Sequence, residues 1–549
     1  MFAFSRLLSA TFVSAVLSSI LASADTLPSL DGTQATLVIS NQNLSPDGFE
    51  RPVTLANGIH PGPIIKAHRG DLLQINLVNN MTDPTQYRGT SIHWHGMFQH
   101  TTNYEDGVAG VNQCPIGPGD SFLYQFSTTN QAGTYWYHSH YRTQYCDGLR
   151  GPLIIYDHQD PFRTMYDVDD ESTIITLADW YHLQSPSITG IAAADATLIN
   201  GQGRYEGGPA VDLAVLNVVA GKRYRIRLIN MACDPDFLFS IDGHDLTVIE
   251  ADGNNVQPVV VNQIHILAGQ RYSAILTANQ AVDNYWLRAL PNDGAGNLPN
   301  TFDGGLNSAI VRYAGAPSID PTSAQQDPFT PLDETTLHPL VPQQVPGAPY
   351  PGGADVNLNL ALSFDFDAWR FYINGLTFNP PSIPVLLQIL SGEQVAQNLL
   401  PQGQVYSIPK NATVEISIPG GLISSPHPFH LHGHSFFVVK SAGTDTDYNY
   451  ANPVRRDVVN TGDLGSNVTI RFRADNAGPW FLHCHIDWHL DLGLAMVLAV
   501  DIEDASLLNQ PPPAWDDLCP IYNNEPLDAT AIQTVATPTT PGFPPPTDP

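Results

Sequence analysis

The stretch NVTIRFRADNAGPWFLHCH, residues 467–485, contains the pattern that decides the fold. In its first half apolar and polar residues alternate, which indicates a half-buried β-strand. A short polar turn follows, and a second apolar run then ends in His483, Cys484 and His485. The stretch therefore predicts two consecutive strands that bring three side chains able to bind metal to one point.

Two earlier stretches repeat this pattern. They are GDSFLYQFSTTNQAGTYWYHSH (119–140) and GQRYSAILTANQAVDNYWLRA (269–289). Each of the three stretches is preceded by an alternating run, which starts at Arg69, Ala220 or Lys410. The chain therefore contains three related units of roughly 130–190 residues, and we expect an all-β protein built from three β-sandwich domains.

The boundaries between these units fall in an acidic segment (157–171) and in a proline-rich segment (317–351). The end of the chain is rich in proline and threonine, a composition that favours disorder. The expected divisions are domain one at 25–157, domain two at 158–318, domain three at 319–520 and a C-terminal tail at 521–549.

The first 24 residues predict a secretory signal peptide. They contain Arg6, a short apolar run and a closing Ala-Ser-Ala. A membrane anchor is the alternative, but the run is weakly apolar, and no later segment approaches the ~20 apolar residues that a spanning helix needs. A secreted, extracellular protein can carry glycans, and Asn-X-Ser/Thr sites occur at Asn43, Asn80, Asn411 and Asn467.

Composition narrows the class of protein further. The 53 acidic and 23 basic residues give a formal net charge of −30. This charge argues against nucleic-acid binding and suits a soluble protein in mildly acidic surroundings. The chain has five cysteines, an odd number. If four of them pair, one is left over, and Cys484 is our candidate for it.

Ten of the 19 histidines lie in four clusters, which are HWHG (His93, His95), HSH (His138, His140), HPFHLHGH (His427, His430, His432) and HCHIDWH (His483, His485, His489). On a strand, residues i and i+2 point to the same face. A His-X-His pair can therefore present two imidazoles to one side, and four clusters in one chain indicate metal binding. The other nine histidines, including His434, His244 and His265, we expect to be structural or at the surface.

The repeat also predicts where the metal lies. Units one and three carry His-X-His at the end of the second strand, whereas unit two carries Arg288-Ala-Leu290. We therefore expect a shared site between units one and three, with unit two as a spacer or as a wall of the substrate site.

Cys484 faces away from its flanking histidines if the strand continues through it. A thiolate with two histidines, His427 and His489, is the ligand set of a blue-copper centre. Cys484 would then join two metal sites through a few covalent bonds and conduct electrons. Zinc is the competing metal, but structural zinc prefers several cysteines or a compact set of four ligands.

At this point the sequence resembles the multicopper oxidases, and among them the fungal, basidiomycete-type laccases. The resemblance covers essentially the whole mature chain. Besides the histidine clusters, it rests on VNQCPIGPGD (111–120), QYCDGLRGPL (144–153), ADATLINGQGRY (194–205), SIDGHDLTVIEADG (240–253) and NPVRRDVV (452–459).

The resemblance implies three cupredoxin-like Greek-key domains and four copper ions. His427, Cys484 and His489 would hold the type 1 copper. His93 and His430 would hold the type 2 copper. The two type 3 ions would be held by His95, His138 and His485, and by His140, His432 and His483.

Leu494 matches the axial position of the type 1 copper. Leucine cannot coordinate, so we expect a three-coordinate copper and a higher potential than a methionine-axial relative would have. Met496 we expect in core packing. The resemblance also implies the disulfides Cys114–Cys519 and Cys146–Cys233.

The implied activity is one-electron oxidation of phenols and aromatic amines, coupled to four-electron reduction of O₂ to water. The electron would leave through His489. Asp234 matches the acidic residue that faces the substrate, and an ionised carboxylate can accept the phenol proton. The alternative is an aspartate that caps a turn before Pro235.

Two further carboxylates match residues near the trinuclear cluster of this family. Asp106 and Asp457 are candidates for proton delivery. The alternatives are a surface turn for Asp106 and a salt bridge to Arg455 or Arg456 for Asp457.

Other readings of the same residues stay open. One is a multicopper ferroxidase that acts on Fe(II), for which Asp234 supplies one carboxylate and we find no second. Another is a non-catalytic copper-binding cupredoxin, but such proteins typically lose ligands and this chain keeps all eleven. The segment YEDGVAGV (104–111) departs from the family pattern without removing a ligand, and Leu492 is a bulky residue that can affect substrate approach. The resemblance suggests a monomer without a membrane partner.

Overall fold

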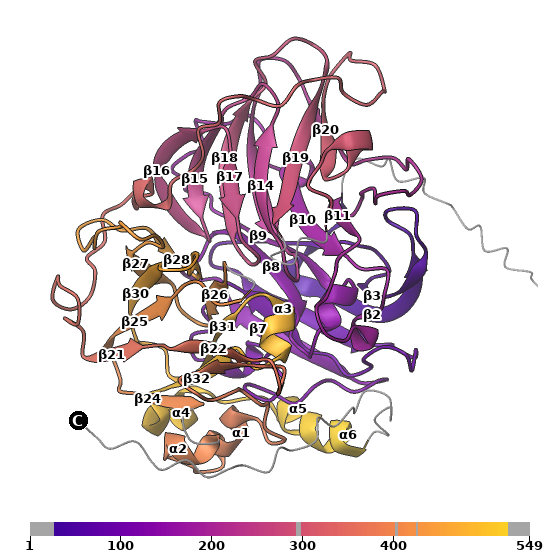
Figure 1. The fold of residues 1–549 in the computed structure, drawn as a ribbon. Coiled ribbons are helices and arrows are strands. Elements are labelled where there is room, and N and C mark those ends of the chain that lie inside the picture. Colours follow the sequence, from indigo (N-terminus) through magenta and orange to yellow (C-terminus); the bar gives the residue numbers. More distant parts are fainter. Residues whose placement is uncertain (1–26, 293–297, 401–403, 424–425, 525–549) are drawn as a thin grey trace, which may run out of the picture.

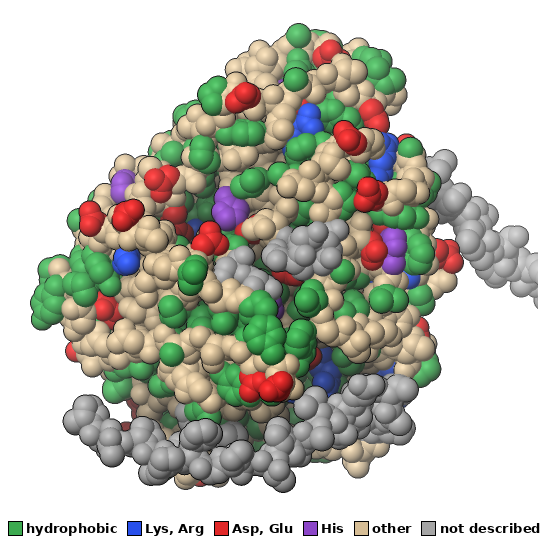
Figure 2. Space-filling view, viewed as in Figure 1, with side chains coloured by type: hydrophobic (Ala, Val, Ile, Leu, Met, Phe, Trp, Pro, Cys, Tyr) green, Lys and Arg blue, Asp and Glu red, His purple; other side chains and the backbone are tan. Residues whose placement is uncertain are grey.

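The computed structural model describes residues 27–292, 298–400, 404–423 and 426–524. The expected signal peptide and all but the first four residues of the expected tail lie outside them. The described chain is mostly β-sheet, with short helices gathered near its C-terminal end (Figure 1). None of the helices in the described residues is long and apolar enough to cross a membrane. On the face drawn in Figure 2, acidic side chains are spread over the surface.

The first region of the chain forms two facing sheets. One has the strand order β1-β4-β9-β8-β6 and the other the order β3-β2-β5-β7. Their bounds are β1 Ser29–Asp31, β2 Ala35–Leu44, β3 Arg51–Ala56, β4 Ile64–His68, β5 Leu72–Asn79, β6 Ile92–His95, β7 Ser121–Ser127, β8 Gly133–Ser139 and β9 Arg150–Tyr156.

The middle region repeats this plan in the orders β11-β10-β13-β18-β15-β16 and β12-β20-β19-β14-β17. The bounds are β10 Ile174–Trp180, β11 Ala196–Ile199, β12 Val215–Val218, β13 Arg223–Asn230, β14 Asp236–Ile241, β15 Leu246–Ala251, β16 Asn254–Val261, β17 Ile264–Ile266, β18 Arg271–Thr277, β19 Asn284–Asn292 and β20 Ser308–Tyr313.

The last region has the orders β21-β25-β30-β27-β28 and β24-β32-β31-β26-β29, and a hairpin of β22 and β23. The strand bounds are β21 Val356–Asn359, β22 Leu362–Asp365, β23 Arg370–Ile373, β24 Val405–Ile408, β25 Thr413–Pro419, β26 Pro428–Leu431, β27 Phe436–Lys440, β28 Arg455–Arg456, β29 Val458–Asn460, β30 Asn467–Arg473, β31 Gly478–Cys484 and β32 Ala495–Val500. The helices are α1 Val385–Leu390, α2 Ala396–Leu399, α3 Asp487–Asp491, α4 Ile502–Leu508, α5 Pro513–Asp516 and α6 Leu518–Asn524.

The repeated stretches form the strand pairs that the sequence predicted. Residues 467–485 become β30 and β31, and the stretches at 119–140 and 269–289 become β7 with β8 and β18 with β19. In β7 burial alternates strictly, as expected for a strand with one wet face. Strands β8 and β31 are buried along their whole length, because each lies inside its sheet and is covered on both faces.

Both expected disulfides are present. Cys114 pairs with Cys519, and Cys146 pairs with Cys233. Cys484 is the free cysteine, and it is fully buried. The odd cysteine of the sequence is therefore the one between the two histidines.

Buried ion pairs join the middle region to the last one. Arg271 of β18 donates two hydrogen bonds to Asp457, from Nη1 to Oδ1 at 2.6 Å and from Nη2 to Oδ2 at 2.7 Å. Arg456 donates to Asp252 at 2.9 Å. The expected alternative for Asp457, a salt bridge to Arg455 or Arg456, is therefore wrong, because an arginine from the neighbouring domain reaches it instead.

We predict that Asp252→Asn destabilises the protein. Asp252 is buried and accepts from Arg456, so its loss leaves a buried guanidinium that only Glu334 still balances. Removing one partner of such a pair costs about 3 kcal/mol of unfolding free energy, measurable by chemical unfolding. Asp167→Asn is the control, because Asp167 and its partner Arg223 are both 39% exposed; it should cost under about 1 kcal/mol. Equal losses in the two variants would contradict the prediction.

Candidate metal centres

Two pairs of neighbouring strands, one from the first region and one from the last, carry or directly adjoin nine of the ten clustered histidines. Strand β6 pairs with β8 so that His93 lies opposite His138. Strand β26 pairs with β31 so that His430 lies opposite His483. All ten clustered histidines are buried, with at most 8% of any residue exposed. Antiparallel pairing thus gathers residues that are distant in sequence into two facing groups.

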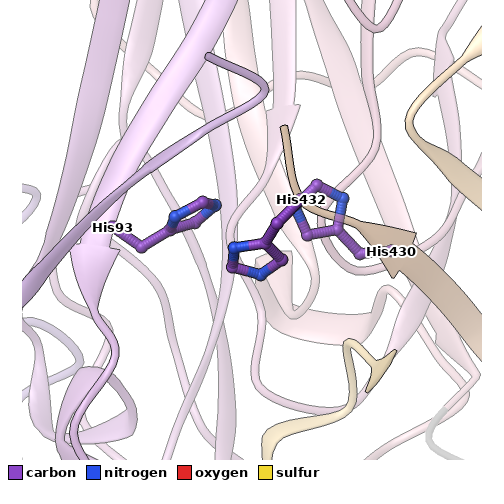
Figure 3. A group of neighbouring side chains, drawn as sticks. All are labelled: His93, His430 and His432. Atoms are coloured by element: carbon purple, nitrogen blue, oxygen red, sulfur yellow. The ribbon is translucent and has the colours of Figure 1, made fainter. Parts of the chain in front are cut away.

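The two groups meet across the domain interface. The rings of His93 and His432 lie 3.9 Å apart, and so do those of His95 and His430. In Figure 3, His93 projects from the first region and His432 lies between it and His430. Nitrogens of His95 and His485 approach to 3.2 Å. The histidines of units one and three therefore gather at one place, where the sequence analysis expected a shared site.

The nitrogens of this cluster fit a bound metal. The Nε2 atoms of His93, His138, His140 and His430 are buried and have no hydrogen-bond partner among the described residues. Burial, together with the neighbouring histidines, lowers the pKa of His138, His140 and His430 well below the ordinary value. Neutral imidazoles with unused lone pairs, sealed from water, are the ligands that copper and zinc accept.

One of the two sets expected for the type 3 ions forms a close group: the ligand nitrogens of His140, His432 and His483 lie within 4.8 Å of one another. A second close group, His93, His95 and His138, shares His95 and His138 with the other expected set. The cluster therefore holds its histidines close enough for more than one metal ion.

A second site lies on the other face of β31. The Sγ atom of Cys484 lies 3.5 Å from Nδ1 of His427 and 3.7 Å from Nδ1 of His489. The two Nδ1 atoms are 3.1 Å apart. Burial raises the pKa of the Cys484 thiol, and the Asp234 charge raises it further, so a cation is needed to hold a thiolate there.

The strand period does not explain His489, because this residue lies on α3. After β31 the chain turns into one helical turn, which returns His489 to Cys484. Leu494 locks this turn: its carbonyl accepts from the Cys484 N–H at 3.1 Å, and its N–H donates to the His489 carbonyl at 3.0 Å. Leu494 is fully buried, and the Phe371 ring lies 4.5 Å from the His489 ring.

The two carboxylates expected near the cluster both contact its histidines. Nδ1 of His432 lies 2.8 Å from Oδ2 of Asp106, and Nδ1 of His93 lies 3.4 Å from Oδ1. Oδ1 of Asp457 lies 3.4 Å from Nε2 of His95. Both aspartates are buried, so the expected alternative of a surface turn for Asp106 is wrong. Burial raises the pKa of Asp106.

Asp234 lies beside the cysteine site. It follows β13, and its N–H donates to Oδ2 of Asp179 at 3.1 Å. The preceding residue, Cys233, accepts a hydrogen bond from the N–H of Asp487 at 2.8 Å, which ties this loop to α3 and so to His489.

The middle region contributes residues that the sequence analysis did not single out. Gly269 packs against the cluster with φ +85°, and a Cβ built on it would lie 2.9 Å from the His485 ring and 3.1 Å from that of His95. Arg271 holds Asp457. Gly269 and Arg271 both lie at the start of the repeated stretch of unit two (269–289). Comparing the repeats shows which positions correspond, but it does not show that these two residues face another domain.

The histidines outside the clusters have structural contacts, as expected. His244 is buried against Tyr313 at 2.7 Å, and His434 packs beside Trp480. His265 pairs with Asp236 at 2.8 Å.

Comparisons with known proteins agree with this geometry. Three multicopper oxidase family models match residues 38–160, 171–316 and 378–504. The chain therefore belongs to the multicopper oxidase family, whose members bind copper.

Its relatives point to one branch of that family. It is 56% identical to a laccase of Phlebia radiata over 90% of this chain and 94% of the relative, and 55% identical to laccase-2 of Pleurotus ostreatus over 90% and 93%. The laccase structure of Botrytis aclada superposes with a TM-score of 0.77 at 32% identity, covering 93% of this chain and 97% of that one. Fet3p, a multicopper oxidase that functions in iron import, superposes at 0.78 with 28% identity, covering 89% and 94%.

We predict that Gly269→Ala lowers the copper content per chain, because the added methyl group displaces the rings of His95 and His485. Gly221→Ala is the matched control: Gly221 has a similar φ of +83°, but a Cβ there meets nothing within 4 Å. Both variants carry the strain of a left-handed alanine, about 1–2 kcal/mol. Metal analysis of the purified proteins should show a loss only in Gly269→Ala; an equal copper content in both would refute the role of Gly269.

Proposed function

We propose that this protein works as a laccase with four copper ions. It oxidises phenols and aromatic amines by one electron and reduces O₂ to water. Each phenol yields one electron and one proton, and four such oxidations with four protons convert O₂ into two waters. When bound, copper supplies the redox chemistry at both sites.

The proposed assignment follows the clusters. The type 1 ion would be held by His427, Cys484 and His489, and the fully buried Leu494 would lie next to it without binding it. The other three ions share the histidine cluster, with His93 and His430 for type 2, His95, His138 and His485 for one type 3 ion, and His140, His432 and His483 for the other.

One observation carries this proposal: β31 serves both sites. Cys484 points to one face of the strand and contacts His427 and His489, whereas His483 approaches His432 to 3.0 Å on the other face. Consecutive residues on opposite faces of a strand are covalently joined. Electrons taken up at the cysteine site therefore have a path of a few bonds to the cluster.

This chain's residues also handle the protons. The edge of the His489 ring faces the substrate. Asp234 accepts the phenol proton, because a carboxylate with a reference pKa of ~3.9 is ionised at mildly acidic pH. At the cluster, Asp106 holds a proton against Nδ1 of His432. Asp457, held by Arg271, stands beside His95 and delivers a proton there.

The setting of the enzyme is part of the proposal. We propose secretion with removal of residues 1–24, a monomer without membrane or nucleic-acid partners, and domains at 25–157, 158–318 and 319–520 followed by a tail. Three of the four candidate glycan sites, Asn43, Asn80 and Asn411, are exposed, and Asn467 is partly exposed.

Fe(II) oxidation is the competing function, because Fet3p functions in iron import. A cation site beside the type 1 copper needs a second carboxylate next to Asp234. Asp236 is the nearest in sequence, but it pairs with His265 at 2.8 Å and is 5% exposed. Asp236 is therefore not available as that second carboxylate.

Oxygen uptake by the copper-loaded protein at pH 4 to 5 tests the function. We expect kcat/KM for a methoxyphenol to exceed that for Fe(II) at least tenfold, about 1.4 kcal/mol in transition-state terms. Asp234→Asn should lower the phenol value about 100-fold, because a general base is lost. A preference for Fe(II) would move the function to iron oxidation.

Leu494→Met should lower the reduction potential of the type 1 copper, because a thioether near the metal favours Cu(II). Met496→Leu is the matched control, since Met496 is buried two residues further on and lies opposite Leu482 in the sheet. Redox titration of the blue absorption measures both. An unchanged potential in Leu494→Met would show that position 494 does not face the copper.

A further inference from the structure

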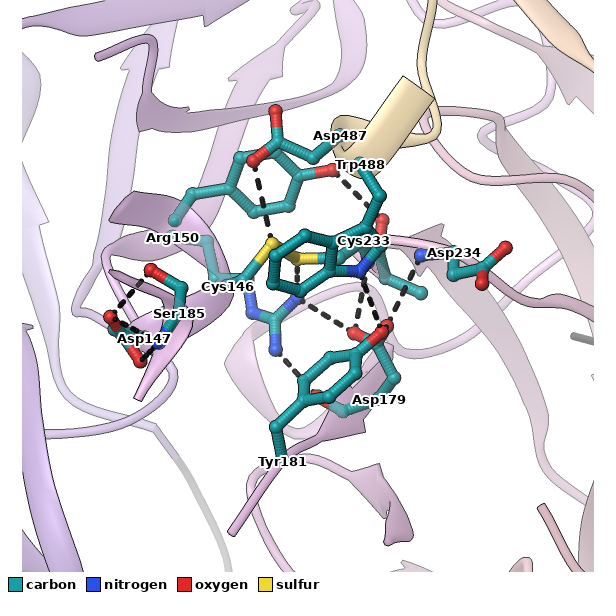
Figure 4. The surroundings of a disulfide bond; sticks show 12 residues. Cys146, Asp147, Arg150, Asp179, Tyr181, Ser185, Cys233, Asp234, Asp487 and Trp488 are labelled. Atoms are coloured by element: carbon teal, nitrogen blue, oxygen red, sulfur yellow. Dashed lines mark hydrogen bonds and ion pairs between the residues drawn. A yellow bond between two sulfur atoms is a disulfide. The ribbon is translucent and has the colours of Figure 1, made fainter. Parts of the chain in front are cut away.

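The carboxylate of Asp179 is linked by hydrogen bonds to residues of all three domains. Asp179 lies in β10 and is fully buried, the one charged residue in an otherwise uncharged strand. Its neighbours come from β9, from the loop after β13 and, through Tyr181, from α3 (Figure 4). A buried carboxylate costs free energy unless it is well bonded, so its bonds indicate its role.

Both carboxylate oxygens hold the loop that carries Asp234. Oδ1 accepts from the N–H of Cys233 at 2.9 Å, and Oδ2 accepts from the N–H of Asp234 at 3.1 Å. Two consecutive N–H groups bound to one carboxylate fix the direction of the backbone at Asp234. Figure 4 shows the Asp234 side chain pointing away from the disulfide and from Asp179.

A second arm of the same carboxylate reaches α3. The Tyr181 hydroxyl donates to Oδ2 at 2.8 Å and accepts from Nε1 of Trp488 at 2.9 Å. The two rings meet edge to face at 5.3 Å. Trp488 directly precedes His489, so one carboxylate is linked both to the proposed proton acceptor and to the helix that presents the proposed electron acceptor.

Neutralising Arg150 does not account for this arrangement. The contact between Arg150 and Asp179 Oδ1 is 3.3 Å, the longest of the four that the carboxylate makes. Arg150 also donates to the backbone carbonyls of Asp179 and Met231. The shorter bonds of the carboxylate go to the loop and to Tyr181.

We propose that Asp179 is a positioning residue for phenol oxidation, which sets Asp234 and His489 at the separation that one phenol hydroxyl must bridge. The inference rests on the proposed function. It predicts that losing Asp179 harms only substrates that need Asp234, because a donor without a proton to release requires His489 alone.

The decisive variant is Asp179→Asn, assayed as the full-length, copper-loaded enzyme. The side chain at position 179 keeps its shape, but one acceptor oxygen is replaced by an NH₂ group that faces N–H or O–H donors. We expect kcat/KM for a methoxyphenol to fall about tenfold, because a reacting group is slightly misplaced. With ferrocyanide, which releases no proton, kcat/KM should stay within about twofold.

Asp147→Asn is the matched control. Asp147 is an equally buried aspartate beside the same disulfide. Among the described residues, its side chain is hydrogen-bonded to Arg51 at 2.8 Å and to Ser185 at 2.7 Å, and not to the Asp234 loop or to α3. Its phenol-to-ferrocyanide ratio should match that of the wild type. Equal losses with both donors in Asp179→Asn, or the same change of ratio in Asp147→Asn, would overturn the proposal.

Hydrogen exchange supplies a readout that does not depend on turnover. In Asp179→Asn the peptide containing Cys233 and Asp234 should exchange faster, because one of its two amides loses its acceptor oxygen, whereas in Asp147→Asn it should not. If Asp179→Asn does not fold, Tyr181→Phe decides: a lower phenol-to-ferrocyanide ratio supports the proposal and an unchanged ratio overturns it. A wild-type enzyme that oxidises ferrocyanide but no phenol would instead refute the proposed function.

Discussion

The structure depends on one constraint: eight of the ten clustered imidazoles are buried where two domains meet, and several of their nitrogens have no hydrogen-bond partner among the described residues. A buried polar atom without a partner costs free energy, so cations bound between these imidazoles stabilise the apposition of β6 and β8 with β26 and β31. Metal binding and domain docking are therefore coupled. The low pKa values of histidines such as His95 and His430 follow from the same burial and leave them neutral and ready to ligate.

The middle domain carries no clustered histidine, yet it supports both sites. Gly269 makes room for the rings of His95 and His485, and Arg271 holds the carboxylate that contacts His95. On the substrate side, Asp179 holds the loop of Asp234. The expected spacer or wall is thus a scaffold that sets the position of residues in the other two domains.

Sequence analysis predicted much of the site because strand geometry is local. The period of two places Cys484 and its flanking histidines on opposite faces whatever the rest of the chain does, and the repeat placed the cluster between units one and three. It missed the turn of helix that brings His489 back to Cys484, because five residues are too few for a helical period. For Asp457 it offered a salt bridge to a neighbouring arginine as the alternative to proton delivery, whereas the arginine that binds it lies 186 residues away in sequence.

The sequence by itself determined the strand pairs, the free cysteine, and the opposite faces on which Cys484 and its flanking histidines lie. These features depend only on the alternation of side chains along a strand and on residue chemistry. Only the tertiary structure decided which carboxylate meets which cation and which backbone: Asp457 with Arg271, Asp252 with Arg456, and Asp179 with the loop of Asp234. The physical reason is that such partners lie far apart in the sequence, so they are selected by packing in three dimensions and not by spacing along the chain.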